Sequence, residues 1–194
     1  MQFKFIPKSS QFETEWSGGT STQLFIYPEV ANYLQRNFLF RISSAKVKAE
    51  ESTFTKLSGV SRIIMILDGE LKIVHATKYT KVLKKFDTDN FDGSWNTKGV
   101  GVCTDFNLMS TGNCKGNLQS IVLNSSQNFK KTLFTKENFT GYYLLAGEVE
   151  LYVSDKKYIL HPNDFILLEK EDITEELKIN PVQYSELVEV EIYL

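Results

Sequence analysis

The sequence contains few of the residues that build metal centres. It has two histidines and two cysteines among its 194 residues. Metal-dependent β-barrel enzymes gather several histidines and a glutamate around one ion, whereas His75 and His161 are far apart in this chain. A calcium loop with alternating aspartates before a glycine is also missing. We therefore expect neither a tightly bound transition metal nor a cofactor, and we interpret each histidine as a strand-end or turn residue.

The two cysteines lack the paired spacing of zinc and redox sites. Cys103 and Cys114 are separated by ten residues, and neither is next to a histidine in the sequence. A disulfide is disfavoured in a reducing compartment, so we expect two free, buried thiols. A catalytic cysteine stays an alternative.

Several functional classes have no support in the sequence. Residues 1–15 lack the apolar stretch of a signal peptide, and no run approaches the length of a membrane-spanning helix. We therefore expect a cytoplasmic protein with no membrane partner. A net charge of −2 gives no basic footprint for nucleic acid. The nucleophile elbow of serine hydrolases and the phosphate-binding loop are also missing.

Strand patterns dominate what is present. Residues 61–74 read SRIIMILDGELKIV, and the Asp-Gly pair at 68–69 predicts a tight hairpin between two strands. Residues 142–153 repeat this pattern around Gly147. The repeat predicts an all-β chain with two strand-rich modules.

A polar segment at residues 124–128 is the best candidate for a domain boundary. We predict a larger N-terminal barrel over residues 1–124 and a smaller C-terminal module over residues 125–194. Helical periodicity is sparse, with at most one or two turns at residues 172–177.

Polar residues that lie among aromatic ones are the candidate functional groups. They are Trp16, Thr20, Gln23, Arg41, Ser43, Arg62, Trp95, Asp105 and Asn107. Arg62 shares a strand face with Ile64 and Ile66, because side chains two apart point the same way. A guanidinium there costs free energy unless it is paired. Two interpretations stay open: Arg41 or Arg62 forms a buried ion pair with Asp105, or one of them binds a ligand carboxylate in bidentate fashion.

Five blocks occur in the order seen in the HutD/Ves family. They are WSGGT at residues 16–20, FRISSA at 40–45, F-x-x-LSGVSR at 54–62, FDGSW at 91–95 and DFNLM at 105–109. The chain resembles this family over residues 12–123, and the remainder matches only in its strand pattern. Many relatives carry an arginine shortly after the first and the last block. This chain has Thr-Ser-Thr at 20–22 and Ser-Thr-Gly at 110–112 instead.

The resemblance implies an RmlC-like double cupin, or bicupin, with two β-barrel or jelly-roll modules in one compact chain. It also implies an association with bacterial histidine utilisation and the absence of the cupin metal ligands. Members of the family are regarded as small-molecule binders with a regulatory or protective role and have no well-established catalytic activity.

Two functions compete. The first is a metal-free binding protein for a small carboxylate or an amino-acid-like metabolite. The second is a metal-independent isomerase, lyase or hydrolase with Asp105 as acid or base, since a carboxylate in an apolar pocket can have the raised pKa that such chemistry needs. An interaction module that uses open sheet edges is a third candidate, and a homodimer is an open alternative.

The predicted pocket lies inside the first module. Asp105 can neutralise only one of two inward arginines, which leaves the other for a ligand carboxylate. Asn107 lies on the same face as Asp105 if the segment is extended. The predicted ligand-binding residues are Trp16, Gln23, Arg41, Ser43, Arg62, Phe91, Asp105 and Asn107, with Trp16 and Phe91 near the mouth.

Overall fold

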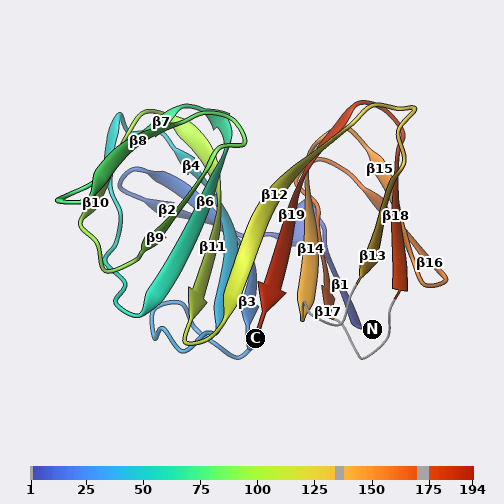
Figure 1. Ribbon diagram of the computed structural model, residues 1–194, viewed down its shortest axis with the longest axis horizontal. Helices are drawn as coiled ribbons and strands as arrows, with labels where there is room; N and C mark the ends of the chain where they lie inside the picture. The colour runs from blue at the N-terminus through green and yellow to red at the C-terminus, as the bar shows by residue number, and fades with distance from the viewer. Residues whose placement is uncertain (1, 134–137, 170–174) are drawn as a thin grey trace. The chain divides into compact units, whose positions relative to one another are not determined.

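The computed structural model describes residues 2–133, 138–169 and 175–194. Its regular structure is all strand apart from one short 3-10 helix, η1 (Lys8–Ser10) (Figure 1). The strands are β1 (Gln2–Ile6), β2 (Glu13–Trp16), β3 (Gly19–Tyr27), β4 (Phe40–Val47), β5 (Glu51–Thr53), β6 (Val60–Gly69), β7 (Leu71–His75), β8 (Tyr79–Leu83), β9 (Thr88–Asp92), β10 (Thr97–Val100), β11 (Cys103–Thr111), β12 (Lys115–Leu123), β13 (Phe129–Leu133), β14 (Phe139–Ala146), β15 (Val149–Val153), β16 (Lys156–Leu160), β17 (Phe165–Glu169), β18 (Glu175–Pro181) and β19 (Ser185–Tyr193).

The all-β prediction is confirmed. None of the described residues forms a helix long and apolar enough to cross a membrane. The helical turns expected at residues 172–177 lie partly outside the described residues, and the described part, from Glu175 onwards, begins strand β18. That part of the prediction was wrong, because pairing with β13 and β15 decides the conformation there.

The chain divides into two compact units. Unit 1 consists of Met1–Gln11 together with Gly116–Leu194, and unit 2 is the continuous segment Phe12–Lys115. The expected N-terminal module covered residues 1–124, whereas unit 2 begins at Phe12 and ends at Lys115. The reason is a long-range strand pairing that no local pattern reveals.

Strand β1 belongs to unit 1 because it completes a sheet there. It pairs antiparallel with β17, from Gln2 opposite Glu169 to Ile6 opposite Phe165. The carboxylate of Asp164 continues this connection, since it accepts a hydrogen bond from the backbone N–H of Lys8 at 2.8 Å.

In unit 1, a five-stranded sheet of order β1-β17-β14-β19-β12 accompanies a four-stranded sheet of order β13-β18-β15-β16. Buried side chains from both sheets form one apolar core, which includes Leu144, Leu151, Ile166, Leu177 and Leu187. Burial of these aliphatic side chains between two layers provides the main driving force for the unit.

Unit 2 is built in the same way. A six-stranded sheet of order β2-β3-β4-β11-β6-β9 accompanies a four-stranded sheet of order β5-β10-β7-β8. Ile64 and Ile66 of the first sheet share a core cluster with Leu71, Ile73 and Leu83 of the second. Each unit is therefore a pair of facing sheets, and neither unit is a closed barrel.

The two repeated Gly-Glu segments are corners between sheets. Strand β6 pairs with β11 and β9, whereas β7, which follows Gly69, pairs with β10 and β8. The same change of sheet takes place after Gly147, between β14 and β15. Gly69 and Gly147 have φ of 78° and 90°, a region that side-chain-bearing residues rarely adopt. The predicted hairpins were therefore wrong in their pairing, although the glycines do mark the points at which the chain passes from one sheet to the other.

Candidate functional site

The candidate site lies on the inner face of the six-stranded sheet of unit 2. Residues that are paired across neighbouring strands point to the same face, so the strand register places side chains in rows. One row runs Ile26, Arg41, Met109, Arg62 and Phe91 from β3 to β9, in that strand order. This row faces the interior, because Phe91 belongs to the core cluster that both sheets share.

A second row carries further polar groups on the same face. It runs Gln23, Ser43, Asn107, Ile64 and Asp89, again from β3 to β9. The next inward position on β11 is Asp105, two residues before Asn107, and it pairs with Ala45 and Ile66. The interior of unit 2 therefore holds a polar strip across an otherwise apolar surface.

Two irregularities in the strand ladders flank this strip. The pairing of β11 with β6 shifts register between Thr104 and Asp105, and the pairing of β3 with β4 shifts between Gln23 and Phe25. A bulge re-aims the side chains next to it and is frequent beside functional sites. Gln23 and Asp105 both stand at such a shift.

Arg62 is the most buried cation of the strip. Only 6% of its surface is exposed, and its Nε has no hydrogen-bond partner among the described residues. Its Cζ atom lies 4.9 Å from the ring centre of Phe54 and 5.3 Å from that of Phe91, close enough for cation–π attraction. Burial lowers the pKa of Arg62 to about 10, and the nearby Asp105 carboxylate opposes this shift. The guanidinium therefore stays charged at neutral pH.

Asp105 is equally enclosed. Its exposed fraction is 3%, and burial raises its pKa to about 6, against the opposing effects of the Arg62 charge and a hydrogen bond from Asn107. Because a carboxylate can only accept, the Asn107 amide directs its nitrogen at Asp105 and keeps its oxygen free. Asp105 Oδ1 and Asn107 Oδ1 are both buried and lack a hydrogen-bond partner among the described residues.

Arg41 lies where the strip meets solvent. Its Nε donates to Gln23 Oε1 at 2.8 Å, and its Nη1 donates to Ser43 Oγ at 2.9 Å. The Tyr33 ring lies 4.5 Å from the Arg41 Cζ atom, and partial burial lowers the pKa of Arg41. Gln23 is exposed. The strip therefore runs from an open end at Gln23 and Arg41 to a closed end at Arg62.

The strand register places seven of the eight predicted site residues on one face of strands β3 to β9. They are Gln23, Arg41, Ser43, Arg62, Phe91, Asp105 and Asn107. The eighth, Trp16, is at the edge of the same face, because it pairs with Gly19, which pairs with Val47 two residues beyond Ala45, the partner of Asp105. Its strand, β2, is three strands away from β11, so Trp16 lies roughly 14 Å across the sheet from Asp105. Its ring packs over Gly18, which leaves no room for a Cβ atom there.

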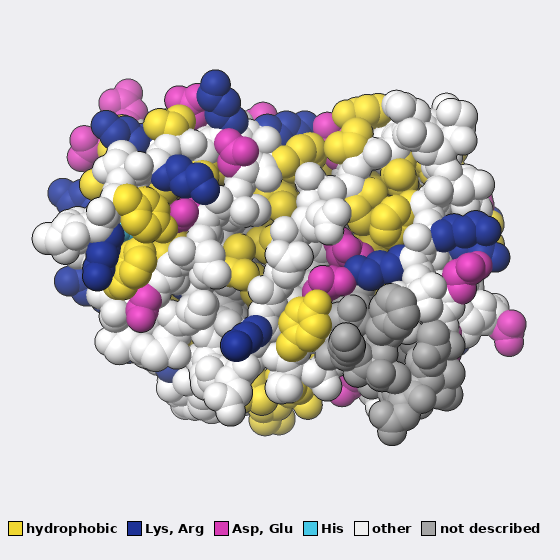
Figure 2. Space-filling view, viewed as in Figure 1, with side chains coloured by type: hydrophobic (Ala, Val, Ile, Leu, Met, Phe, Trp, Pro, Cys, Tyr) yellow, Lys and Arg dark blue, Asp and Glu magenta, His cyan; other side chains and the backbone are white. Residues whose placement is uncertain are grey.

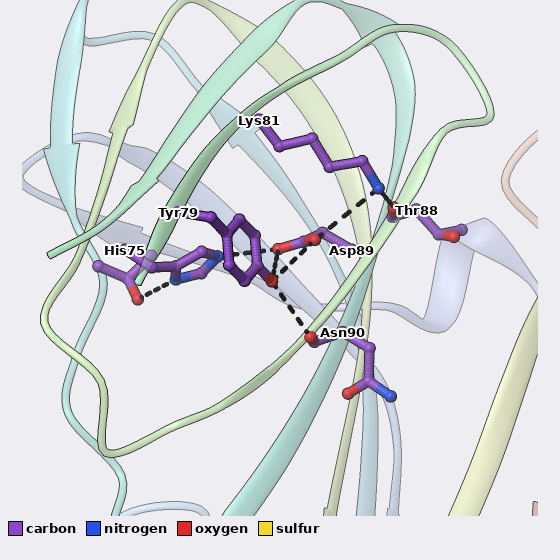
Figure 3. Close-up of polar contacts among 7 residues, drawn as sticks. His75, Tyr79, Lys81, Thr88, Asp89 and Asn90 are labelled. Carbon is purple, nitrogen blue, oxygen red and sulfur yellow. Dashed lines mark hydrogen bonds and ion pairs between the residues drawn. The ribbon is translucent and has the colours of Figure 1, made fainter. Parts of the chain in front are cut away.

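A second polar cluster surrounds His75 (Figure 3). The His75 ring lies within hydrogen-bond distance of Thr97 Oγ1 through Nδ1 and of Asp89 Oδ2 through Nε2, both at 2.8 Å. The Tyr79 hydroxyl donates to Asp89 Oδ1 at 3.1 Å, and Lys81 Nζ lies 3.9 Å from the same oxygen. Burial and the Asp89 charge raise the pKa of Tyr79 to about 12.

Sequence reasoning missed this cluster. His75 is the last residue of β7, as expected of a strand-end histidine, but it is 2% exposed and its ring lies 4.7 Å from Phe91 and 5.2 Å from Trp95 between ring centres. No spacing rule connects residues 75, 89 and 97, since three strands bring them together. The available signal was Asp89 two residues before Phe91, which places a carboxylate and an aromatic ring on one face of an extended segment.

A cavity of about 450 Å³ lies near one end of strands β6, β9 and β11, and its wall includes Ser61, Asn90 and Ser110. Ser61 pairs with Ser110 and Asp92, a row that alternates with the row of Arg62, so these side chains point to the opposite face of the sheet and this cavity is separate from the strip. On the face shown in Figure 2, Lys and Arg side chains alternate with Asp and Glu, and neither sign forms a continuous stripe. Long-range electrostatic attraction of a polyanion is therefore weak on this face.

No group of three or more His, Cys, Asp and Glu residues is placed to hold a metal ion within the described ranges. Cys103 and Cys114 are both free and buried. Burial raises the pKa of Cys103 to about 12 and that of Cys114 to about 11, so both thiols are protonated at neutral pH. Protonated thiols are poor nucleophiles, which argues against the catalytic-cysteine alternative.

The family comparison matches most of the chain. The family model described as HutD matches residues 8–185. No curated protein sequence matches the chain.

Solved structures share the fold at low sequence identity. The conserved protein of unknown function PA5104 from Pseudomonas aeruginosa PAO1 has a TM-score of 0.86 and 16% identity, and the match covers 100% of each chain. HutD from Pseudomonas fluorescens SBW25 has a TM-score of 0.72 and 17% identity, over 97% of this chain and 98% of that one. A cupin 2 conserved barrel domain protein from Leptotrichia buccalis has a TM-score of 0.58 and 12% identity, over 97% and 95% of the two chains. The predicted cupin-type fold is confirmed.

Proposed function

Because the chain belongs to the HutD family, we propose that it binds a small carboxylate or an amino-acid-like metabolite, without a metal, on the inner face of unit 2. The single observation that carries this proposal is the unpaired Nε of the buried Arg62. A buried donor without a partner costs about 1–3 kcal/mol, and more when the group is charged. A ligand carboxylate supplies both the missing acceptor and the missing negative charge.

The charges of the strip support an anionic ligand. Two guanidinium groups, Arg41 and Arg62, share the face with two carboxylates, Asp105 and Asp89. Asp89 already contacts His75 Nε2 at 2.8 Å and has the Lys81 ammonium 3.9 Å away, so Asp105 alone opposes the two guanidinium groups and one positive charge is left over. The neutral partners of Arg41 offer hydrogen bonds but no charge. A buried pair of Arg62 and Asp105 and a ligand carboxylate at Arg62 are compatible. The Asp105 charge acts on Arg62, yet Arg62 Nε and Asp105 Oδ1 both lack a hydrogen-bond partner among the described residues.

The family membership supports a proposal for the role in the cell. We place the protein in the cytoplasm, where free buried thiols are stable, with a regulatory or protective role connected with histidine degradation. Binding a pathway metabolite without converting it would suit either role.

A ligand screen tests the proposal. Small carboxylates that bind the native state raise the melting temperature by mass action. Arg62→Met should weaken binding of any such ligand about tenfold to a hundredfold, the value of one charged hydrogen bond. Lys84→Met is the matched control, because Lys84 is an exposed cation of the same unit. Equal affinity in the two variants would refute the assignment of Arg62.

Asp105 favours one alternative, a metal-independent enzyme. A carboxyl with a pKa of about 6 exchanges its proton near neutral pH, as a general acid or base must. Incubating the protein with histidine-derived carboxylates and detecting products by mass spectrometry separates the two functions. An enzyme would form product in the parent and lose turnover in Asp105→Asn, while the binding protein would return each compound unchanged.

A further inference from the structure

We propose that the ligand of the strip carries an N–H group beside its carboxylate, held by the Asp105 and Asn107 side chains. This inference rests on the proposed function and specifies the chemical class of the ligand. Among the described residues, three unpaired buried atoms belong to the strip: one donor, Arg62 Nε, and two acceptors, Asp105 Oδ1 and Asn107 Oδ1.

A carboxylate alone cannot satisfy these three atoms. Its oxygens accept the hydrogen bond of Arg62, but they offer nothing to the two acceptors, and a second negative charge near Asp105 is unfavourable. An N–H group has the opposite character, since it donates and has no negative charge. Two acceptors close together on one face suit an ammonium or an amide nitrogen.

The hydrogen bond to Asp105 determines which end of the Asn107 amide is unpaired. The amide hydrogen-bonds the Asp105 carboxylate, and only its nitrogen can do so while the carboxylate is ionised. The oxygen must then lie on the other side. Asp105 therefore has one oxygen engaged by Asn107 and the other unpaired.

The strand register keeps donor and acceptors within reach of one small molecule. Arg62 pairs with Met109, Asn107 is two residues along β11, and Asp105 is two residues further. Inward side chains two apart on a strand are separated by about 7 Å, so the backbone of Asp105 is about 13 Å along the sheet from that of Arg62. The long Arg62 side chain shortens this distance, since the Asp105 charge acts on its guanidinium. A molecule of amino-acid size that carries both groups can span the remaining distance.

Matched compounds test this inference. The first set is glutarate, L-glutamate and N-acetyl-L-glutamate, and the second is acetate, glycine and N-acetylglycine. Within a set the members share a carbon chain and differ in having no N–H, an ammonium group or a neutral N–H. Isothermal titration of the parent should show the N–H members binding about tenfold to a hundredfold more tightly than the first member.

Variants assign the effect to its residues. In Asp105→Asn the advantage of L-glutamate over glutarate should shrink at least tenfold, whereas Asp68→Asn, an exposed aspartate of the same unit, should leave it unchanged. If Asp105→Asn reduces the affinity advantage of L-glutamate but not that of N-acetyl-L-glutamate, the Asp105 charge holds an ammonium group. If the advantage of N-acetyl-L-glutamate over glutarate persists in Asp105→Asn, the site also accepts a neutral N–H group.

The outcomes separate this inference from the proposed function. If glutarate and acetate bind as tightly as their N–H counterparts, and Arg62→Met weakens them all, the carboxylate site stands and the N–H inference is wrong. An N–H advantage that is unchanged in Asp105→Asn and in Asn107→Leu also overturns the inference. If no member of either set binds the parent, the proposed function and this inference fail together.

Discussion

The charge on Asp105 should make the protein less stable as the pH rises. Its pKa is raised to about 6 in the folded state from an ordinary value of 3.8. Below pH 3.8 the carboxyl is protonated in the folded and unfolded states, and the free energy of unfolding carries no contribution from it. Between 3.8 and about 6 the unfolded chain releases the proton while the folded protein keeps it, so the free energy of unfolding falls as the pH rises.

The size of this effect follows from the displacement of the pKa. At about 1.4 kcal/mol for each pH unit, the ionised carboxylate costs about 3 kcal/mol once the pH is well above 6. Asp105→Asn mimics the protonated carboxyl at every pH. We therefore expect this variant to be about 3 kcal/mol more stable relative to the parent at pH 7.5 than at pH 3.8.

Urea unfolding of the ligand-free protein between pH 3.5 and pH 8 measures the difference. Asp68→Asn, an exposed position, is the control and should follow the parent curve. Parallel curves for the parent and Asp105→Asn would show that the carboxyl titrates normally, and the account of the strip as a costly buried charge would be wrong. A gain in stability by removing this charge would also indicate that it is retained for binding.

Three further predictions concern other parts of unit 2. Gly69→Ala should lower the free energy of unfolding by about 3 kcal/mol, because an added Cβ meets the Val102 carbonyl oxygen at positive φ, whereas Gly59→Ala, also at positive φ but in open space, should cost about 1 kcal/mol in thermal or urea unfolding. Asp89→Ala should cost about 3 kcal/mol or more by leaving the buried His75 ring nitrogen unpaired, and Tyr79→Phe about 1 kcal/mol; equal costs for the two would contradict the cluster's geometry. Cys103 and Cys114 should react with a thiol reagent at pH 8 only after denaturation, and rapid labelling of both in the native protein would disprove their burial.

The candidate strip was predictable from alternation along single strands. Arg41 and Ser43, like Asp105 and Asn107, are two residues apart in extended segments, so each pair had to share a face. Alternation could not show that the segments are neighbours in one sheet, because register is set by long-range pairing. Tyr33 and Phe54 were missed for a related reason: they lie outside strands, and only the folded loops carry their rings to Arg41 and Arg62.

The errors in the fold have the same origin. An Asp-Gly pair between apolar segments predicts a change of chain direction at Gly69, but it does not specify which strands the two segments then join. Trp16 stays a predicted residue of the pocket mouth, and its position on the edge strand β2 depends on pairing with Gly19, which alternation along one strand could not reveal. The assignment of β1 to unit 1 depends on a partner near the other end of the sequence.

The placement of unit 2 as a continuous segment inside the sequence of unit 1 has a consequence for synthesis on the ribosome. Every strand of unit 2 has emerged once residue 115 has left the exit tunnel, so its two sheets can assemble while the rest is still being translated. Strand β1 is made before unit 2 but must wait for β17. During that interval its unpaired edge is exposed to other chains, and a nascent protein that stalls before β17 is the form most exposed to aggregation.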